Sequence, residues 1–356
     1  MKRLLGIALL AGLFLASSTS CYTPSDLRLN QMQVIGTHNS FHIEPSPEKL
    51  ALMLQFRPDA YLLQYTHTPL NEQLQNEGVR QFELDIFADS TGNLWAPMGR
   101  PGFKVAHIEQ VDMDSTCPVL VDCLQIIKNW SDWHNDHVPI AIMLEVKDDA
   151  DIPVAPDPEI ITAALMRDLD AEIRSVFPEN RLITPDDIRG THATLEQAVL
   201  SDGWPKLTDV RGQVMFFVDG KRDLYRDGHQ SLEGRAAFTS STPGQPDAAV
   251  IKRDDPTGAN QAQIRSLVQQ GYLVRTRADE PVQTPMDNDF ATRDAALSSG
   301  AQWVSTDYPI PGMATRFSGS TYVAQIPGGT PGRCNPVNAP AGCTNAMVEA
   351  NTPPNP

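Results

Sequence analysis

Side chains that can transfer a proton or bind a metal ion lie at the ends of four apolar runs in the N-terminal half of the chain. They are His38 and Asn39, Glu83 and Asp85, His107, and Glu145 with Lys147. Taken singly, each has an ordinary structural explanation, such as a hydrogen-bonded histidine or a carboxylate paired with a lysine. Taken together, two histidines, three carboxylates and an amide facing one point would concentrate negative charge, which predicts a functional site.

The types of ligand in this set indicate which metal it would hold. Three carboxylates and an amide oxygen are hard ligands suited to Ca²⁺, with water and substrate oxygens completing the shell. Zinc is disfavoured because no cluster of cysteine and histidine has the spacing of a zinc site. The net charge of −16 excludes nucleic acid and anionic membranes as general partners. An acidic protein that handled a phosphodiester would need a local positive centre, which a metal ion would provide.

Eight strand-like runs, rich in Val, Ile, Leu and Phe, alternate with helix-like segments and must position these side chains. Strands are expected at Val34–His38, Val79–Phe87, Phe103–His107, Pro139–Lys147, Gln213–Gly220, Ala248–Lys252, Tyr272–Arg277 and Ala301–Thr306. Helices are expected at Pro69–Glu77, Val119–Asp136, Pro158–Val176, Ala259–Gln270 and Phe290–Ser299. This alternation predicts an α/β fold, a single (β/α)8 TIM barrel in which the strand ends meet at one mouth. The sixth strand is the weakest assignment because Ala236–Thr239 competes for it.

The two ends of the chain are predicted to lie outside the barrel. Residues 1–20 combine a basic head, a short apolar core and small residues, as a secretory signal does. The barrel is assigned to residues 21–327, and a Pro-, Gly- and Asn-rich irregular tail to residues 328–356. We therefore expect an exported monomer, periplasmic or extracellular, without a transmembrane helix.

The cysteines agree with export. Cys117 with Cys123 and Cys334 with Cys343 are spaced for two short-loop disulfides. Cys21 remains, directly after the expected cleavage region. It is a candidate for lipid attachment, and ordinary cleavage nearby is the alternative.

Four segments together resemble the catalytic half of the phosphatidylinositol-specific phospholipase C family, and above all its bacterial calcium-dependent branch. They are Gly36-Thr37-His38-Asn39-Ser40-Phe41, Phe82-Glu83-Leu84-Asp85, Val105-Ala106-His107 and Met143-Leu144-Glu145. The similarity runs from about Gln33 to Pro311. The resemblance implies that Asn39, Glu83, Asp85 and Glu145 hold calcium and that His38 and His107 are the catalytic pair.

The implied reaction is attack of the inositol 2-hydroxyl on phosphorus, which forms a cyclic phosphate and expels diacylglycerol. Calcium would lower the pKa of the hydroxyl and offset charge at phosphorus. Glu83, Glu145 or His38 could accept the proton, and His107 would protonate the leaving oxygen. His38 could instead hydrogen-bond a phosphoryl oxygen.

Further side chains near the expected mouth are candidates for substrate contact. Basic residues could meet phosphates or hydroxyls, or be ion-paired parts of the structure, and an aromatic ring could stack on the sugar or lie in the core. The candidates are Lys147, Lys221, Arg275, Arg277 and Trp303. The remaining histidines have no comparable context and are expected to be non-catalytic: His42, His67, His134, His137, His192 and His229.

Two other functions remain open at this stage. A glycerophosphodiester phosphodiesterase would share the barrel, the metal and a histidine pair, although Asn39 stands where that family usually has arginine. A surface lipoprotein that kept the barrel as a binding module is the second alternative. No catalytic histidine or ligand carboxylate has been lost, which disfavours it.

Overall fold

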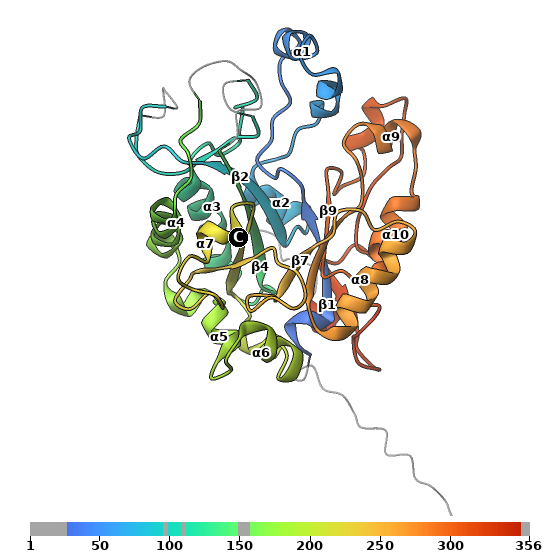
Figure 1. Cartoon of the computed structure of the whole chain (residues 1–356). Helices are drawn as coiled ribbons and strands as arrows, with labels where there is room; N and C mark the ends of the chain where they lie inside the picture. The colour runs from blue at the N-terminus through green and yellow to red at the C-terminus, as the bar shows by residue number, and fades with distance from the viewer. Residues whose placement is uncertain (1–26, 95–98, 109–110, 149–156, 350–356) are drawn as a thin grey trace, which may run out of the picture.

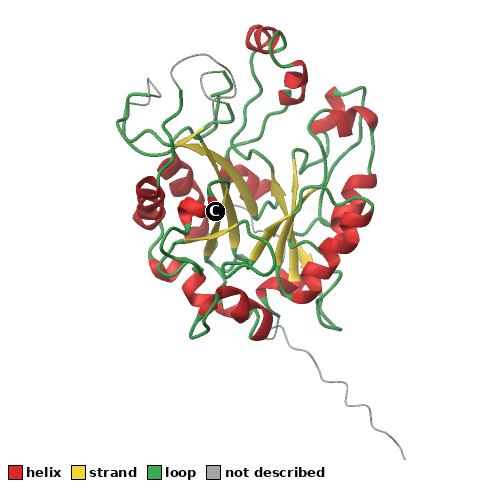
Figure 2. Cartoon of the chain, viewed as in Figure 1, coloured by secondary structure: helices red, strands yellow, loops and turns green. Residues whose placement is uncertain are grey.

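Parallel strands form the centre of the molecule and helices cover their outer side (Figure 1; Figure 2). The structure is a computed structural model and describes residues 27–94, 99–108, 111–148 and 157–349. The parallel strands are β1 (Met32–Thr37), β2 (Gln81–Phe87), β4 (Ile140–Lys147), β5 (Val214–Asp219), β6 (Ala237–Thr239), β7 (Val250–Lys252), β8 (Leu273–Arg277) and β9 (Trp303–Thr306). Almost every residue in them is buried, as expected for parallel strands covered on both faces.

The order of these strands is β6-β5-β4-β2-β1-β9-β8-β7. The two ends of this row meet through a single parallel bridge between Ser240 and Val250. The sheet is therefore a nearly closed barrel of eight strands within the described residues, which confirms the predicted fold.

The helices connect successive strands and pack outside them. They are α1 (Pro47–Met53), α2 (Leu70–Asn76), α3 (Leu120–Trp133), α4 (Ala163–Val176), α5 (Pro185–Arg189), α6 (Leu195–Ser201), α7 (Arg222–Tyr225), α8 (Ala259–Gln270), α9 (Gln283–Asp287), α10 (Ala291–Ser299) and α11 (Asn345–Val348). The five predicted helices correspond to α2, α3, α4, α8 and α10. In α4, Thr162 caps the first turn by accepting from the Leu165 amide, and Met166, Leu169 and Ile173 turn inward.

One strand assignment made from the sequence was wrong. The run ending at His107 contains only the short strand β3 (Lys104–Val105), which pairs antiparallel with the end of β2 and is not part of the barrel row. β2 and β4 are direct neighbours, and the eighth barrel strand is β6, next to β5, in the segment that competed for the sixth strand. The predicted number of eight barrel strands was thus correct, but β6 is one of them and the run at residues 103–107 is not.

The barrel interior is filled by aromatic side chains below the mouth. Trp303 is fully buried and stacks on Phe217, with the ring centroids 5.2 Å apart and the planes 8° from parallel. These residues belong to β9 and β5, so the pair spans the interior. The prediction that Trp303 stacks on a substrate sugar is therefore wrong, because its ring is part of the core.

The C-terminal tail is more ordered than the sequence suggested. Its strand β10 (Gly332–Cys334) pairs antiparallel with β1, and beyond α11 the buried carboxylate of Glu349 pairs with buried Arg80. Both predicted disulfides, Cys117–Cys123 and Cys334–Cys343, are present.

Two disulfides indicate an extracellular or periplasmic protein. The predicted signal segment, residues 1–20, and Cys21 lie outside the described residues. In the part of the chain that the structure describes, no helix has both the length and the apolar character needed to cross a bilayer.

Candidate active site

Three of the predicted metal ligands converge at the carboxyl ends of two adjacent strands. β2 and β4 pair in parallel, with Asp85 opposite Glu145. Glu83 lies two residues before Asp85 and so faces the same side of the sheet. Glu83, Asp85 and Glu145 each offer a carboxylate oxygen, and these oxygens lie within 4.8 Å of one another. The barrel thus brings together the acidic group predicted from the sequence.

The electrostatics of this group favour a bound cation. Burial raises the pKa of Glu83 to about 7, with the charge of Glu145 adding to the effect. Burial likewise raises the pKa of Asp85 well above its ordinary value, and the charges of Glu145 and Glu83 act in the same direction. Buried carboxylates that repel one another are stabilised in their charged form by a divalent ion. The set of oxygen donors suits Ca²⁺.

Asn39, the fourth predicted ligand, borders the acidic group. Its φ of 43° lies in the left-handed region, which asparagine tolerates better than most residues. The amide lies between the Tyr65 hydroxyl, 3.0 Å away, and Asp85 Oδ1, 3.2 Å away. Without a cation, the Asn39 amide bonds best to both neighbours when Nδ2 donates to Asp85 and the amide oxygen accepts from the Tyr65 hydroxyl. A bound Ca²⁺ would require the reverse orientation, with the amide oxygen inward and Nδ2 donating to Tyr65. The four predicted ligands therefore fit a calcium ion.

Two basic side chains predicted to contact substrate instead lie against these carboxylates. Lys147 Nζ is 2.6 Å from Asp85 Oδ2 and 3.9 Å from Glu145 Oε1. The Arg275 guanidinium is fully buried and pairs with both Glu83 and Asp254. Arg275 thus holds Glu83 in place from below, and the prediction that it contacts substrate is wrong.

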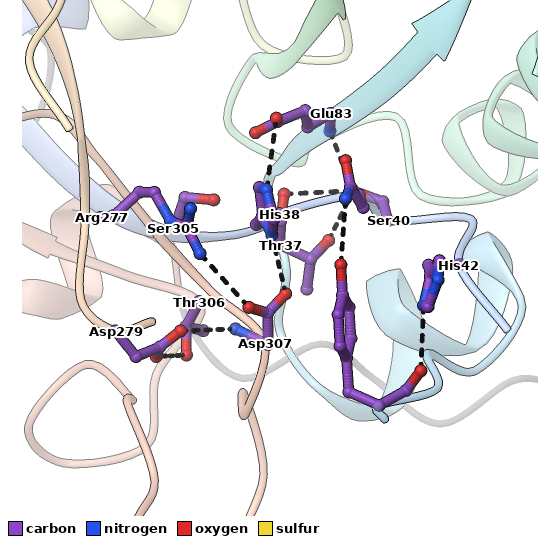
Figure 3. Close-up of polar contacts among 12 residues, drawn as sticks. Thr37, His38, Ser40, His42, Glu83, Arg277, Asp279, Ser305, Thr306 and Asp307 are labelled. Carbon is purple, nitrogen blue, oxygen red and sulfur yellow. Dashed lines mark hydrogen bonds and ion pairs between the residues drawn. The ribbon is translucent and has the colours of Figure 1, made fainter. Parts of the chain in front are cut away.

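His38 lies directly beyond β1, between a carboxylate on each side (Figure 3). Its Nδ1 is 3.1 Å from Asp307 Oδ1, and its Nε2 is 3.8 Å from Glu83 Oε1. Burial, followed by the charge of Arg277, lowers the pKa of His38 to about 3. Because a carboxylate only accepts, the ring proton lies on Nδ1, and Nε2 keeps a free lone pair.

His107 has a similar partner on the other side of the acidic group. Its Nδ1 is 2.9 Å from Asp112 Oδ2, so the ring again donates from Nδ1. Burial lowers the pKa of His107, against the opposing effect of the hydrogen bond to Asp112. The same oxygen of Asp112 lies 2.9 Å from Nε2 of His42, whose Nδ1 is 2.9 Å from the Tyr65 carbonyl oxygen.

Of the other predicted substrate contacts, Arg277 is the best placed. Its Nη2 lies 3.5 Å from Asp307 Oδ2, beside His38. Within the described residues, its buried Nε and Nη2 atoms have no hydrogen-bond partner, as suits an anion that enters with substrate. Lys221 follows β5 and forms an ion pair with Asp148.

The side chains that orient the two histidines were not predicted from the sequence. Asp307 and Asp112 are not among the predicted site residues, and His42 and His67 were expected to be non-catalytic. His67 donates from Nε2 to the His38 carbonyl oxygen at 2.9 Å, and this nitrogen is 3.5 Å from Asp307. Asp307 follows the last barrel strand just as His38 follows the first, and this repeated position at a strand end was a usable signal.

Histidines beside a cation site can donate and accept protons while the ion stabilises negative charge. This combination at the mouth of a barrel defines an enzyme of metal-assisted hydrolysis or phosphoryl transfer. Comparison with known proteins narrows the class. A sequence profile described as phosphoinositide phospholipase C, Ca²⁺-dependent, matches residues 27–98 and 93–336. The chain therefore belongs to the family of calcium-dependent phosphoinositide phospholipases C.

Solved structures agree with this assignment at the level of the fold. A calcium-dependent phosphoinositol-specific phospholipase C from Pseudomonas sp. is 18% identical, with a TM-score of 0.55 over 87% of this chain and 96% of its own. A Ca²⁺-dependent phosphatidylinositol-specific phospholipase C from Streptomyces antibioticus is 19% identical, with a TM-score of 0.54 over 80% and 95% of the two chains. A search of curated proteins finds no match.

Proposed function

We propose that this enzyme cleaves phosphatidylinositol by internal attack of the inositol 2-hydroxyl on phosphorus, releasing diacylglycerol and a cyclic inositol phosphate. One arrangement supports this proposal above all. Glu83, Asp85 and Glu145 form an acidic group with His38 and His107 nearby, and each histidine hydrogen-bonds a buried aspartate.

His38 is the proposed general base. Asp307 fixes the proton on Nδ1, so that Nε2 can accept the proton of the attacking hydroxyl. The pKa of about 3 keeps this nitrogen unprotonated at neutral pH. Burial opposes ionisation of Asp307, but its interactions with His38, His67 and Arg277 hold the pKa of its carboxyl below the usual range. It can therefore stabilise the imidazolium that forms.

His107 is the proposed general acid. In its imidazolium form, whose charge Asp112 stabilises, the ring donates from Nδ1 to Asp112 and carries on Nε2 the proton for the departing glycerol oxygen. Arg277 is the proposed contact for a non-bridging phosphate oxygen. Calcium held by Asn39, Glu83, Asp85 and Glu145 would supply electrostatic stabilisation of the charge at phosphorus and lower the pKa of the hydroxyl.

The basic residues at the mouth favour an inositol ring without further phosphates. Their charges are matched by carboxylates: Lys147 by Asp85, Lys221 by Asp148, Lys252 by Asp219 and Arg277 by Asp307. A ring that carried extra phosphates would have to displace these partners. Hydroxyl groups can hydrogen-bond to the same side chains without doing so.

The test is hydrolysis of phosphatidylinositol with calcium and with excess chelator. We expect diacylglycerol and cyclic inositol phosphate only when calcium is present, and poor restoration by magnesium, which prefers a smaller octahedral shell. Full activity in chelator would rule out the metal. Faster hydrolysis of glycerophosphocholine than of glycerophosphoinositol would instead support the glycerophosphodiesterase alternative.

A further inference from the structure

A hollow on the outer flank of the barrel is lined by residues that take no part in the proposed reaction. It lies beside α2 and α3, two helices that pack against each other, and has a volume of about 350 Å³. That volume is large enough for a small-molecule site. We call this hollow the flank pocket. Its lining contains no carboxylate, lysine or arginine and consists of Asn71, Ile126, Asn129, Trp130, Trp133 and His134.

Most of the flank pocket is one stripe of α3. Four of its lining residues recur at helical spacing and so lie on the same face of this helix: Ile126, Asn129, Trp130 and Trp133. Trp133 is the last residue of α3 and precedes β4, so it lies toward the end of the barrel away from the mouth. A ligand held against it would therefore leave the mouth open to substrate.

The aromatic rings of the flank pocket form a fixed floor and an exposed wall. Trp130 is buried, its Nε1 donates to Gln75 Oε1 at 2.9 Å, and the Arg80 guanidinium lies 4.7 Å from its ring centroid. His134 stacks on Trp130, with the ring centroids 4.3 Å apart and the planes 14° from parallel. Trp133, in contrast, is 78% exposed, more than any other large apolar side chain among the described residues. An exposed indole beside fixed rings is an unused surface for stacking.

The polar groups of the flank pocket indicate what kind of ligand it takes. Nδ1 of His134 donates to the Trp130 carbonyl oxygen at 2.8 Å, so Nε2 keeps a lone pair that can accept a hydrogen bond. Asn129 Oδ1 accepts from Gln125 Nε2 at 2.8 Å, which leaves Nδ2 to donate. The exposed amide of Asn71 can do both. Neutral donors and acceptors together match hydroxyl groups, whereas an anion would require cationic donors and an ammonium ion would favour carboxylates.

We propose that the flank pocket binds a neutral saccharide, with one sugar ring against the indole of Trp133 and its hydroxyl groups bonded to Asn71, Asn129 and His134. A pyranose with equatorial hydroxyls has C–H bonds on both faces, so it stacks on an aromatic ring while the hydroxyls at its edge reach the amides. The chain has a net charge of −16, which would repel an acidic glycan but not a neutral one. The pocket would hold the enzyme on a glycan while the mouth stays free, and it does not depend on the proposed function.

The test adds cellobiose, maltose or chitobiose to protein whose tryptophans are isotope-labelled and follows the indole resonances by NMR. The Trp133 resonance, identified by its loss in Trp133→Ala, should shift and saturate with at least one disaccharide, at an affinity on the order of millimolar. Isothermal titration should show binding weakened about tenfold or more in Trp133→Ala.

Two further variants sharpen this test. Asn129→Asp keeps the acceptor for Gln125 but removes the donor, and it should weaken binding several-fold. Leu200→Ala is the matched control, because this exposed apolar side chain lies on α6, outside the pocket, and the variant should bind like the parent. The exposure of Trp133 predicts an unchanged unfolding midpoint in Trp133→Ala, so that lost binding is not lost folding.

Other ligands provide the outcomes that would overturn the proposal. No shift of the Trp133 resonance with any of the three disaccharides would do so, as would a shift with phosphocholine alone, which would indicate a site for a quaternary ammonium ion. A stronger shift with myo-inositol than with the disaccharides would indicate a second site for the substrate headgroup instead. A parent that dimerises in solution, with Trp133→Ala monomeric, would show that a second copy covers the pocket.

Turnover distinguishes the flank pocket from the active site. Trp133→Ala should cleave phosphatidylinositol at the rate of the parent in the presence of calcium. If the parent binds a disaccharide through Trp133 but does not cleave phosphatidylinositol, the proposed function fails and the saccharide site stands. If it cleaves this lipid without binding any disaccharide, the saccharide site fails and the proposed function stands.

Discussion

The two histidines of the site are held in different ways. His38 lies at the end of a barrel strand, and its partner Asp307 lies at the end of the neighbouring strand, since β1 and β9 pair with Thr37 opposite Thr306. His107 lies outside the barrel row, and its partner Asp112 is five residues further along the same loop. His38, the proposed base, is thus positioned by the long-range closure of the sheet, and His107, the proposed acid, by local structure.

This difference has a consequence for how each side of the site can be altered. A change that disturbs the β1–β9 pair would move His38 and Asp307 together. His107 depends on a turn in which the His107 and Ile108 amides both donate to the Asp112 carbonyl, at 3.2 and 3.1 Å. We therefore expect the effects of mutations on the His107 side to stay local.

The largest expected effect is that of His107→Ala. If His107 protonates the leaving oxygen, this change should cost roughly 10²–10⁴-fold in rate on a substrate with an alkoxide leaving group. The loss should shrink greatly on an acidic phenol leaving group, because that oxygen departs without a proton. His38→Ala should show no such rescue. Steady-state rates on the two substrates measure both effects, and equal losses for His107→Ala on both would show that it is not the acid.

The next largest effect is expected from replacing the two aspartates, which distinguishes the His38 side of the site from the His107 side. Asp112→Asn and Asp307→Asn preserve shape but can donate to the imidazole and favour the wrong tautomer, which costs up to about 10⁴-fold where a histidine depends fully on its carboxylate. We expect losses of roughly 10²-fold. Only the loss in Asp112→Asn should be rescued by a phenol leaving group. Calcium affinity, measured by titration, should stay unchanged in both, and a large fall would mean that these residues serve the metal site.

Calcium binding should weaken as the pH falls through about 7. The pKa of Glu83 is raised to about 7 by burial, so below that pH a proton occupies a ligand that must be charged to bind the ion. Apparent affinity should then drop by about tenfold per pH unit for each proton displaced. Isothermal titration at several pH values measures this slope, and saturating calcium should restore activity at the lower pH. An affinity independent of pH between 5 and 8 would contradict the raised pKa.

Much of this site could be predicted because strand ends in a barrel converge. That rule located His38, Glu83, Asp85 and Glu145 from local apolar runs alone. Asp307 also follows a strand, but its pairing with His38 could not be predicted, because the two are 269 residues apart and only the pairing of the first and last strands brings them together. The depth of a side chain along a strand is also absent from the sequence pattern, so Trp303 was placed at the mouth and not in the core.

The strand assignment at residues 103–107 failed for a related reason. Apolar content alone does not distinguish a barrel strand from a short antiparallel offshoot of its neighbour. The connection between β2 and this run offered a better signal, because two neighbouring parallel strands must be joined by a long crossover, which is usually helical. Residues 88–102 are rich in Gly and Pro and carry no helical pattern. A segment without a crossover helix should have been read as an extension of β2.

The smallest expected effect concerns His42, which supports the His107 side of the site. Among the described residues, only the rings of His42 and His107 bond to the Asp112 carboxylate. His42 therefore steadies the carboxylate that orients the proposed acid. His42→Asn can reach neither Asp112 nor the Tyr65 carbonyl as the ring does, and leaves buried polar groups without partners. We expect a loss of stability of about 1–3 kcal/mol in urea unfolding, and a loss of rate of only a few-fold on the natural substrate. The rate loss should disappear on the phenol substrate, because a misaligned acid is then not needed. The His42 amide donates to the Asn39 carbonyl at 2.9 Å, so His42 is also linked to the calcium side of the site. A rate loss that persists on the phenol substrate would show that His42 acts through that link and not through the acid.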